Sequence, residues 1–189
     1  MPRLQEKYIK EVLPVMREKF DYKNVMAVPK ITKVVLNTGF GGMIKEKTAD
    51  ERKKIQEAVL NDLTLIAGQR AILTRAKKSI AGFKLRQGTP VGAIVVLRKK
   101  KMSDFLDRLI QIALPRTRDF QGIELKSIDK AGNLTTAVKE HIAFPEILPE
   151  KAKFIFSFEV TVVTTTKNRE EGKELLRLLG FPIKDTPKA

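Results

Sequence analysis

Apolar side chains recur every four positions at the start of the chain, which is the spacing of one side of a helix. The residues that follow this spacing are Leu4, Tyr8, Val12, Met16 and Phe20. Pro14 interrupts the pattern, because proline lacks a backbone N–H and its ring clashes with the preceding turn. The sequence therefore predicts an N-terminal helix over 3–20 with a kink or a break near Leu13.

The segment 30–37, KITKVVLN, alternates between polar and apolar residues in the manner of a half-buried strand. One face carries Thr32, Val34 and Leu36, and the other carries Ile31, Lys33, Val35 and Asn37. Lys33 and Asn37 are therefore predicted to share a side. Further strands are predicted at 70–75, 91–98 and 153–163. In the last, Phe154, Phe156, Phe158, Val160 and Val162 point one way.

Three later segments have helix signals at both ends. Thr48 followed by Glu51 is a capping-box pattern, and an apolar stripe then continues to Gly68. A helix over 103–114 is predicted to start at Ser103 and to stop before Pro115. The C-terminal helix is predicted over 168–180. Helices and strands intermix without βαβ repetition, which favours a single α+β domain over 1–189 with a largely antiparallel sheet.

The net charge of the chain indicates that it is a binding protein. The 189 residues include 37 Lys and Arg against 22 acids, a net charge of +15 at neutral pH. This excess indicates a polyanionic partner, for which nucleic acid is the commonest candidate. No cysteine is present, which excludes disulfides and thiolate metal sites. The longest apolar run, 91–97, is too short to span a bilayer, so we expect a soluble protein without a membrane partner.

Candidate catalytic chemistry is sparse. His141 is the only histidine, and a structural role is the simpler interpretation of it than catalysis. Gly39, Gly41 and Gly42 follow a predicted strand, as in loops that bind phosphate through backbone N–H groups. No Gly-Lys-Ser/Thr follows them, so a tight turn at the strand end is the simpler interpretation. A phosphate-handling enzyme that uses these glycines with Lys45 or Lys47 is kept as an alternative.

The segment 69–102 contains no Asp or Glu. Its cations are Arg70, Arg75, Lys77, Lys78, Lys84, Arg86, Arg98, Lys99, Lys100 and Lys101. Such a block provides salt-dependent affinity for nucleic acid by counterion release. Within it, Ile80, Gly82 and Phe83 are apolar where solubility favours polar residues, and such groups can pack on riboses or unstacked bases. Asn37, Gln69 and Ser79 add neutral partners suited to phosphates and 2′-hydroxyls.

Four motifs resemble the bacterial large-subunit ribosomal protein five family. They are VVLNTGFGG at 34–42, GQRAILTRAKKSIAGFKLRQGTPVG at 68–92, FLDRLIQIALPRTRDFQG at 105–122 and HIAFPEI at 141–147. The resemblance covers about 8–182. It implies a structural RNA-binding protein of the large ribosomal subunit, not an enzyme, with no cofactor and no small-molecule substrate. It also implies an α+β domain whose curved sheet and adjoining helix hold 5S ribosomal RNA (rRNA) in the central protuberance, beside other rRNA and ribosomal proteins.

The resemblance also implies three contact regions. The resemblance gives Asn37, Gly39, Gly41, Gln69 and Arg98 as rRNA-binding candidates, and Lys33 joins them because it is predicted to share a strand face with Asn37. The basic loop, residues 75–88, resembles an extended tip that reaches the transfer RNA (tRNA) in the peptidyl site, through Arg75, Lys77, Lys78, Ser79, Phe83, Lys84 and Arg86. A bridge to small-subunit ribosomal protein thirteen is expected at Arg116, Arg118, Asp119 and Gln121.

The chain departs from the family pattern over 127–134, where it reads SIDKAGNL instead of SFDGRGNY. Contacts of this segment are therefore not transferred. Nor is an RNA hydrogen bond transferred to Val96, where many relatives have a hydroxyl residue. A generic duplex binder without ribosomal attachment is a further alternative, which competition between 5S rRNA and unrelated duplex would separate.

Overall fold

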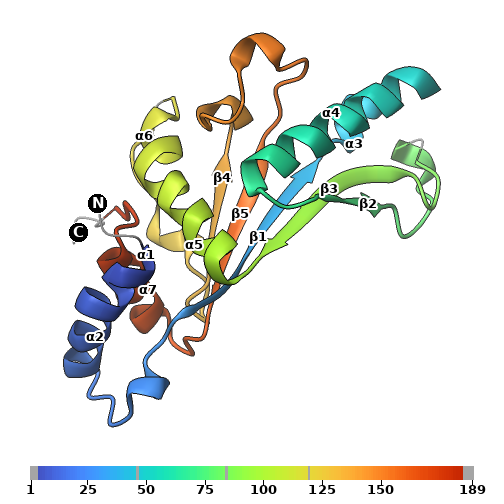
Figure 1. Ribbon diagram of the computed structural model, residues 1–189. Helices are drawn as coiled ribbons and strands as arrows, with labels where there is room; N and C mark the ends of the chain where they lie inside the picture. The colour runs from blue at the N-terminus through green and yellow to red at the C-terminus, as the bar shows by residue number, and fades with distance from the viewer. Residues whose placement is uncertain (1–3, 46, 84, 119, 185–189) are drawn as a thin grey trace.

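The computed structural model describes residues 4–184 except 46, 84 and 119. Its centre is one five-stranded sheet in the order β2-β3-β1-β5-β4, and every neighbouring pair is antiparallel. The strands are β1 Ile31–Gly39, β2 Ile72–Arg75, β3 Pro90–Leu97, β4 Leu134–Val138 and β5 Phe158–Thr164. Helices lie on one face of this sheet and beside its ends (Figure 1), and one continuous core extends from Leu4 to Phe181 without the tip of the β2–β3 hairpin. The predicted α+β fold is confirmed.

The alternation predicted for β1 is present in the structure. Val34 and Leu36 are fully buried, whereas Lys33 and Asn37 lie on the opposite face. The buried face packs against α4 (Ala49–Ala67) and α5 (Lys99–Arg108), which contact β3 and β1 respectively. The opposite face carries no helix of the described residues and is called the open sheet face below.

Helix α4 has the boundaries that its capping signals predict. Thr48 Oγ1 accepts from Glu51 N at 3.4 Å, and Glu51 Oε2 accepts from Thr48 N at 3.0 Å. This hydrogen bond to the Thr48 backbone, with Lys47 nearby, lowers the pKa of the Glu51 carboxyl. At the other end Gly68 has φ of 61°, the left-handed conformation that glycine adopts without strain.

Thr48→Ala is expected to lower the free energy of unfolding by about 1 kcal/mol, because it removes an acceptor for an otherwise unpaired N–H at the helix start. Urea denaturation measures the change. Thr48→Ser is the matched control, since it keeps the hydroxyl, and it is expected to retain most of the stability. An equal loss in both variants would show that the cap contributes little.

The N-terminal helix accommodates Pro14 without a break. It consists of α1 (Leu4–Lys7), the π-helical turn η1 (Tyr8–Val12) and α2 (Leu13–Lys19). Leu13 N–H bonds to Tyr8 O, five residues back, so the chain widens immediately before the proline. The expected disturbance is therefore present as a π turn, and the prediction of a kink or a break is replaced by a continuous helix.

The helix predicted over 103–114 is longer at both ends, so its predicted bounds were wrong. It comprises α5, the π turn η4 (Leu109–Ala113) and α6 (Leu114–Arg116), which includes Pro115. Arg98 is the N-cap, and the Ser103 hydroxyl lies inside the helix, where it donates to Lys99 O at 3.4 Å. Ser103 was a misleading start signal because a serine hydroxyl can also bond within its own helix.

The strand predicted over 153–163 is confirmed only in part. β5 begins at Phe158, because β4, a strand that the sequence did not predict, pairs with β5 only from Val138 opposite Phe158 onward. The preceding residues 153–157 keep their alternating burial and pack beside the 3₁₀ turn η6 (His141–Ala143), whose His141 N–H bonds to Phe156 O at 3.1 Å. The tertiary pairing, not the local pattern, sets the strand boundary.

The C-terminal helix α7 (Arg169–Leu179) ends at Gly180, as predicted. It packs against the N-terminal helix, and Lys19 Nζ lies 2.9 Å from Glu174 Oε1. These helices lie at one end of the sheet, and α4 and the β2–β3 hairpin lie at the other (Figure 1).

The remaining short helices are α3 Gly41–Ile44 and the 3₁₀ turns Val25–Ala27, Ala81–Phe83, Leu125–Ser127 and Pro149–Lys151. Within the described residues, no helix is long and apolar enough to cross a bilayer.

Candidate nucleic-acid interface

The open sheet face is built from cross-strand rows of side chains. In one row Asn37 lies between Ile94 of β3 and Glu159 of β5. In the next row Val35 lies between Val96 and Thr161. Because β4 and β5 are antiparallel as well, Thr135 continues this second row, and its hydroxyl lies 3.3 Å from that of Thr161. The result is a surface of half-exposed and exposed side chains.

The structure brings Lys33, Asn37, Gly39 and Arg98 onto this one surface, whereas Gly41 lies in α3, beyond the end of β1. Lys33 precedes Val34, and Arg98 follows Leu97, and these two neighbours are paired across β1 and β3. Lys33 and Arg98 therefore lie together at one end of the open sheet face, and Asn37 and Gly39 lie toward the other end. Gln69 lies at the sheet edge, where its Nε2 donates to Val96 O at 3.2 Å. This bond leaves the Gln69 carbonyl oxygen available as an acceptor.

The fold does not require glycine at positions 39, 41 and 42, at the end of β1 and the start of α3. The chain turns at Phe40 into the single helical turn α3, where Met43 N donates to Phe40 O at 3.0 Å, so the predicted tight turn at the strand end is present as one turn of helix. None of Gly39, Gly41 and Gly42 has a positive φ. A Cβ at Gly39 or Gly42 would meet no atom within 4 Å, and one at Gly41 would make only an ordinary contact with Val91 at 3.8 Å. Neither packing nor backbone conformation therefore requires glycine here.

The basic loop is a closed hairpin tip that extends the β2–β3 hairpin. Gly88 N donates to Ala76 O, Ala76 N donates to Thr89 O, and Ile80 and Leu85 exchange two more backbone bonds. Beyond this pair Phe83 is 65% exposed, and Ile80 itself is 45% exposed. The tip therefore presents apolar side chains to solvent on a hydrogen-bonded frame, not on a loose loop.

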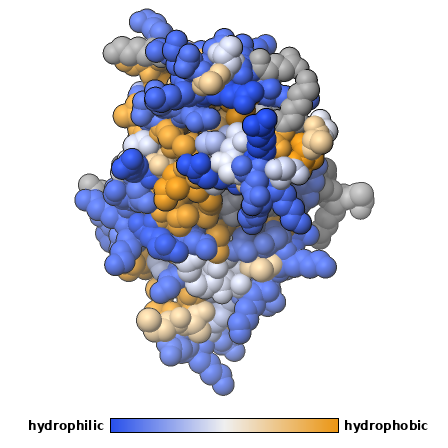
Figure 2. Space-filling view, turned by 90° about the vertical axis from the view of Figure 1, so that its right-hand side faces the viewer, coloured by the Kyte–Doolittle hydropathy of each residue, from blue (hydrophilic) through white to orange (hydrophobic). Residues whose placement is uncertain are grey.

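Two of the predicted tRNA-binding residues also hold the tip together. Ser79 Oγ accepts from Gln87 N at 2.9 Å, and Arg75 donates to Gly88 O at 3.1 Å. Lys77, Lys78 and Arg86 are exposed. Lys84 lies outside the described residues. Figure 2 views the molecule from the side of this tip and shows hydrophilic side chains over most of the face, with apolar groups among them.

The predicted bridge residues fall into two places. Arg116 and Arg118 line a pocket of about 240 Å³ together with Lys139 and Glu140. Gln121 points elsewhere, because its Oε1 accepts from Lys184 Nζ at 3.2 Å. Asp119 lies outside the described residues. The structure therefore groups the two arginines at one pocket, which Gln121 does not line.

His141 is buried in the fold, which agrees with a structural role and not with catalysis. It is fully buried, and its ring stacks on Phe156 with centroids 4.2 Å apart. Nδ1 lies 3.4 Å from Phe156 N, and Nε2 lies 3.4 Å from Asp62 Oδ2. Burial lowers the pKa of His141, although the Asp62 carboxylate opposes the shift. Across the described part of the chain, no group of three or more His, Asp or Glu side chains could hold a metal ion.

Sequence reasoning missed part of the open sheet face. Neither Thr161 nor Thr135 was a candidate. Thr135 belongs to β4, which the sequence did not predict. A signal existed for Thr161, which lies between Val160 and Val162 in the alternating strand pattern, whereas Thr135 and Thr136 are adjacent and mark neither face of β4.

Comparison with known proteins gives matches along nearly the whole chain. A family model described as ribosomal protein L5 matches residues 24–86, and a second model, described as the C-terminus of the same ribosomal family, matches residues 90–183. The large ribosomal subunit protein uL5 of Clostridium beijerinckii is 51% identical over 183 residues, which cover 97% of this chain and 99% of that protein. The protein of the same name from Geotalea daltonii is 49% identical over 185 residues, 98% and 100% of the two chains. This chain belongs to the ribosomal protein L5 family.

Proposed function

We propose that the chain is a structural constituent of the large ribosomal subunit that binds 5S rRNA through the open sheet face. The observation that carries the proposal is the convergence of Lys33, Asn37 and Arg98 on one sheet face that no described helix covers, with Gln69 at its edge. Gly39 is on the same surface, with no internal reason to lack a side chain. Glycine is suited to a surface on which a nucleic-acid backbone approaches closely.

Charge is unevenly distributed on this face, which favours a particular orientation of the RNA. Lys33 and Arg98 supply two cations at one end. Asn37 instead lies beside Glu159, whose carboxylate repels phosphate. We therefore place phosphates at the Lys33 and Arg98 end, and sugar hydroxyls or base edges beside Asn37. A hydroxyl or amino group can donate to the Glu159 carboxylate, whereas a phosphate cannot.

The apolar part of the face fits single-stranded or looped RNA better than a regular duplex. Val35 and Val96 form a half-exposed row next to the polar residues. Such short side chains can pack on riboses and on unstacked bases, whereas a duplex shields its base faces. This preference separates the proposal from generic duplex binding.

The basic loop is proposed to contact tRNA in the peptidyl site. Phe83 and Ile80 are exposed on a closed hairpin tip, and an exposed aromatic ring beside cations suits the sugar and base surfaces of a folded RNA.

In the same assembly, Arg116 and Arg118 are proposed to meet small-subunit ribosomal protein thirteen. Neighbouring rRNA and ribosomal proteins are the remaining partners, and the ribosome of the cytoplasm is the proposed location.

The division of labour between the two surfaces is tested with 5S rRNA alone. Arg98→Ala is expected to weaken 5S rRNA binding roughly tenfold, because it removes a charge-assisted contact, and Asn37→Ala by a smaller factor. Removal of residues 76–85, with a short linker in their place, is expected to leave the affinity nearly intact. Gel shifts across a salt series measure each dissociation constant.

Arg86→Ala is the matched control, because it removes the same charge from the basic loop. Loss of 5S rRNA capture on loop removal, with Arg98→Ala unaffected, would reverse the assignment of the two surfaces. Unrelated duplex RNA that competes as well as 5S rRNA would favour the generic duplex binder instead.

A further inference from the structure

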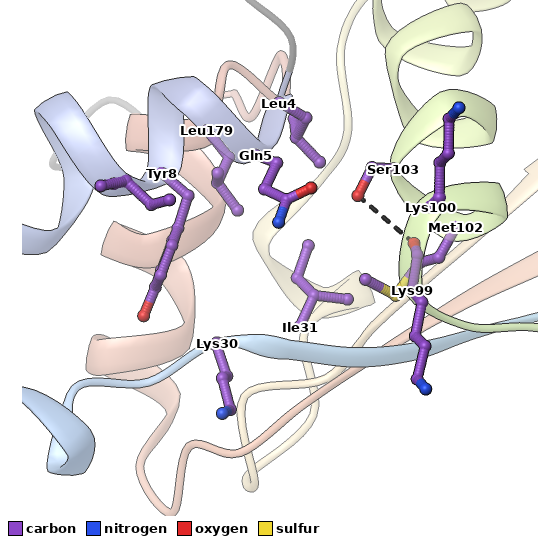
Figure 3. A pocket seen from close by; sticks show the side chains of 11 residues that line it. Leu4, Gln5, Tyr8, Lys30, Ile31, Lys99, Lys100, Met102, Ser103 and Leu179 are labelled. Atoms are coloured by element: carbon purple, nitrogen blue, oxygen red, sulfur yellow. Dashed lines mark hydrogen bonds between the residues drawn. The ribbon is translucent and has the colours of Figure 1, made fainter.

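A groove of about 490 Å³ lies between the N-terminal helix, the start of β1 and the start of α5 (Figure 3). Its walls are largely apolar and include Tyr8, Ile9, Ile31 and Met102. This size is within the range of sites that enclose small molecules or single building blocks of a polymer. None of the candidate rRNA, tRNA or bridge residues lines it.

The rim of the groove is basic. Lys30, Lys99 and Lys100 contribute exposed ammonium groups, and none of the described lining residues is acidic. In Figure 3 the amide of Gln5 reaches over the middle of the groove, and the lysine side chains extend away from its centre. An apolar floor beneath a cationic rim is complementary to a ligand with a flat apolar part and an attached anion. One neutral amide is placed where it can bond to the edge of that flat part.

Parts of the groove are held in place by the fold. The Tyr8 hydroxyl donates to Pro29 O at 3.0 Å, which fixes the ring against the start of β1. Lys99 has φ of 53°, a conformation that costs energy for a residue other than glycine. Strained backbone of this kind concentrates at functional sites, because the surrounding structure maintains it at a cost in stability.

The groove is continuous in the chain with the proposed 5S rRNA surface. Lys99 follows Arg98 directly, and Lys30 lies three residues before Lys33. Arg98 and Lys33 lie together at the end of the open sheet face, so both strands lead from that surface to the rim of the groove. A polyanion whose phosphates contact Lys33 and Arg98 is therefore brought next to Lys30 and Lys99.

We propose that this groove binds one unpaired nucleotide of the rRNA strand that lies on the open sheet face. The base occupies the apolar floor beside Tyr8 and Ile9, the Gln5 amide bonds to its edge, and the flanking phosphates lie near Lys30, Lys99 and Lys100. The inference rests on the proposed function, since it extends the 5S rRNA interface from the sheet onto the N-terminal helix.

The test compares two pairs of lysine substitutions that remove the same charge. The double variant Lys30→Ala with Lys100→Ala is expected to weaken binding of a 5S rRNA transcript about tenfold more than the double variant Lys23→Ala with Lys101→Ala, whose lysines do not line the groove.

A second comparison changes apolar side chains and leaves the charge unaltered. Ile9→Ala is expected to weaken binding severalfold, and Val15→Ala, an exposed apolar residue on the same helix, is expected to leave it unchanged.

A photoreactive benzoylphenylalanine in place of Ile9 locates the contact. It is expected to cross-link to one unpaired nucleotide of 5S rRNA, whereas the same group in place of Val15 is not. Equal effects of the two lysine pairs, together with no cross-link from position 9, would overturn the inference and leave the groove to a different class of partner. If the unaltered chain showed no preference for 5S rRNA over unrelated duplex, the proposed function itself would fail, and the inference with it.

Discussion

Gly172→Ala is expected to destabilise the fold by about 3 kcal/mol, although the same change in an exposed helix normally stabilises by about 1 kcal/mol. Gly172 is in the first turns of α7, where a Cβ would meet the backbone of Gly132, with Gly132 O at only 2.6 Å. The carbonyl and Cα of Gly132 are main-chain atoms, so they cannot rotate away as a side-chain tip can. Overpacking against main chain is therefore the larger of the two opposing effects.

The loop that carries Gly132 cannot easily shift to make room. Asn133 donates to both oxygens of Asp129 at 2.8 Å, through its backbone N–H and its side-chain amide. Gly132 O accepts from the Thr164 hydroxyl at 3.1 Å, and Ala131 O accepts from the Thr166 hydroxyl at 2.6 Å. Gly132 itself has φ of 76°, which any other residue adopts only with strain. A shift of this loop would break several of these bonds at once.

Thermal or urea unfolding of Gly172→Ala measures the effect. Lys173→Ala, at the next position of the same helix, is the control and is expected to change stability by less than about 0.5 kcal/mol. A variant as stable as the unaltered chain would show that the loop moves at little cost, and that helix propensity decides the outcome at this position.

His141→Ala is expected to lower the free energy of unfolding at pH 7.5 by about 3 kcal/mol. The side chain is fully buried and stacked on Phe156, so its removal leaves a cavity beneath the loop that precedes β5. It also leaves Phe156 N–H without its Nδ1 acceptor. His141→Phe keeps the stacked ring and fills the cavity, and it is expected to recover most of the packing.

The same residue predicts a pH dependence of stability. Burial lowers the pKa of His141 in the folded state, so below about pH 6.5 the unfolded chain takes up a proton that the folded chain excludes. The free energy of unfolding therefore falls as the pH drops below that value, by at most about 1.4 kcal/mol per pH unit. Burial also raises the pKa of Asp62. A raised carboxyl pKa stabilises the folded chain as the pH falls, which is opposite to the effect of His141, and it acts at lower pH, in the carboxyl range.

Urea unfolding at pH 7.5 and pH 6.0 tests this dependence. The unaltered chain is expected to lose stability between the two values, and His141→Phe is expected to lose less, because the chain has no other histidine. An equal loss in both proteins would assign the pH dependence to other groups.

The elements that the sequence predicted well depend on local signals. The capping box at Thr48 and Glu51 and the glycine at 68 define α4 from residues a few positions apart, whatever the rest of the chain does. The alternation in β1 likewise required that Lys33 and Asn37 share a face, because successive side chains of a strand point to opposite sides. The excess of cations indicates a polyanionic partner whatever fold carries the charges.

The errors lie where distant segments decide the outcome. β4 was missed because its adjacent Thr135 and Thr136 interrupt any polar–apolar alternation, and it exists as a strand because β5 pairs with it. Ser103 resembles a helix start, yet α5 begins at Lys99, because β3 ends at Leu97 and the chain turns through the left-handed backbone of Lys99 into the helix. The close approach of Gly132 and Gly172 joins segments that lie far apart in the sequence, which no local pattern indicates.

The sequence by itself therefore determined the fold class, the basic character and the polar side of β1. Only the tertiary structure decided which surface these features form. Antiparallel pairing of β1 with β3 placed Arg98 beside Lys33, and packing of the N-terminal helix against α5 created the lysine-rimmed groove. The physical reason is that periodicity and capping act over a few residues, whereas a binding surface depends on register and packing between segments far apart in the chain.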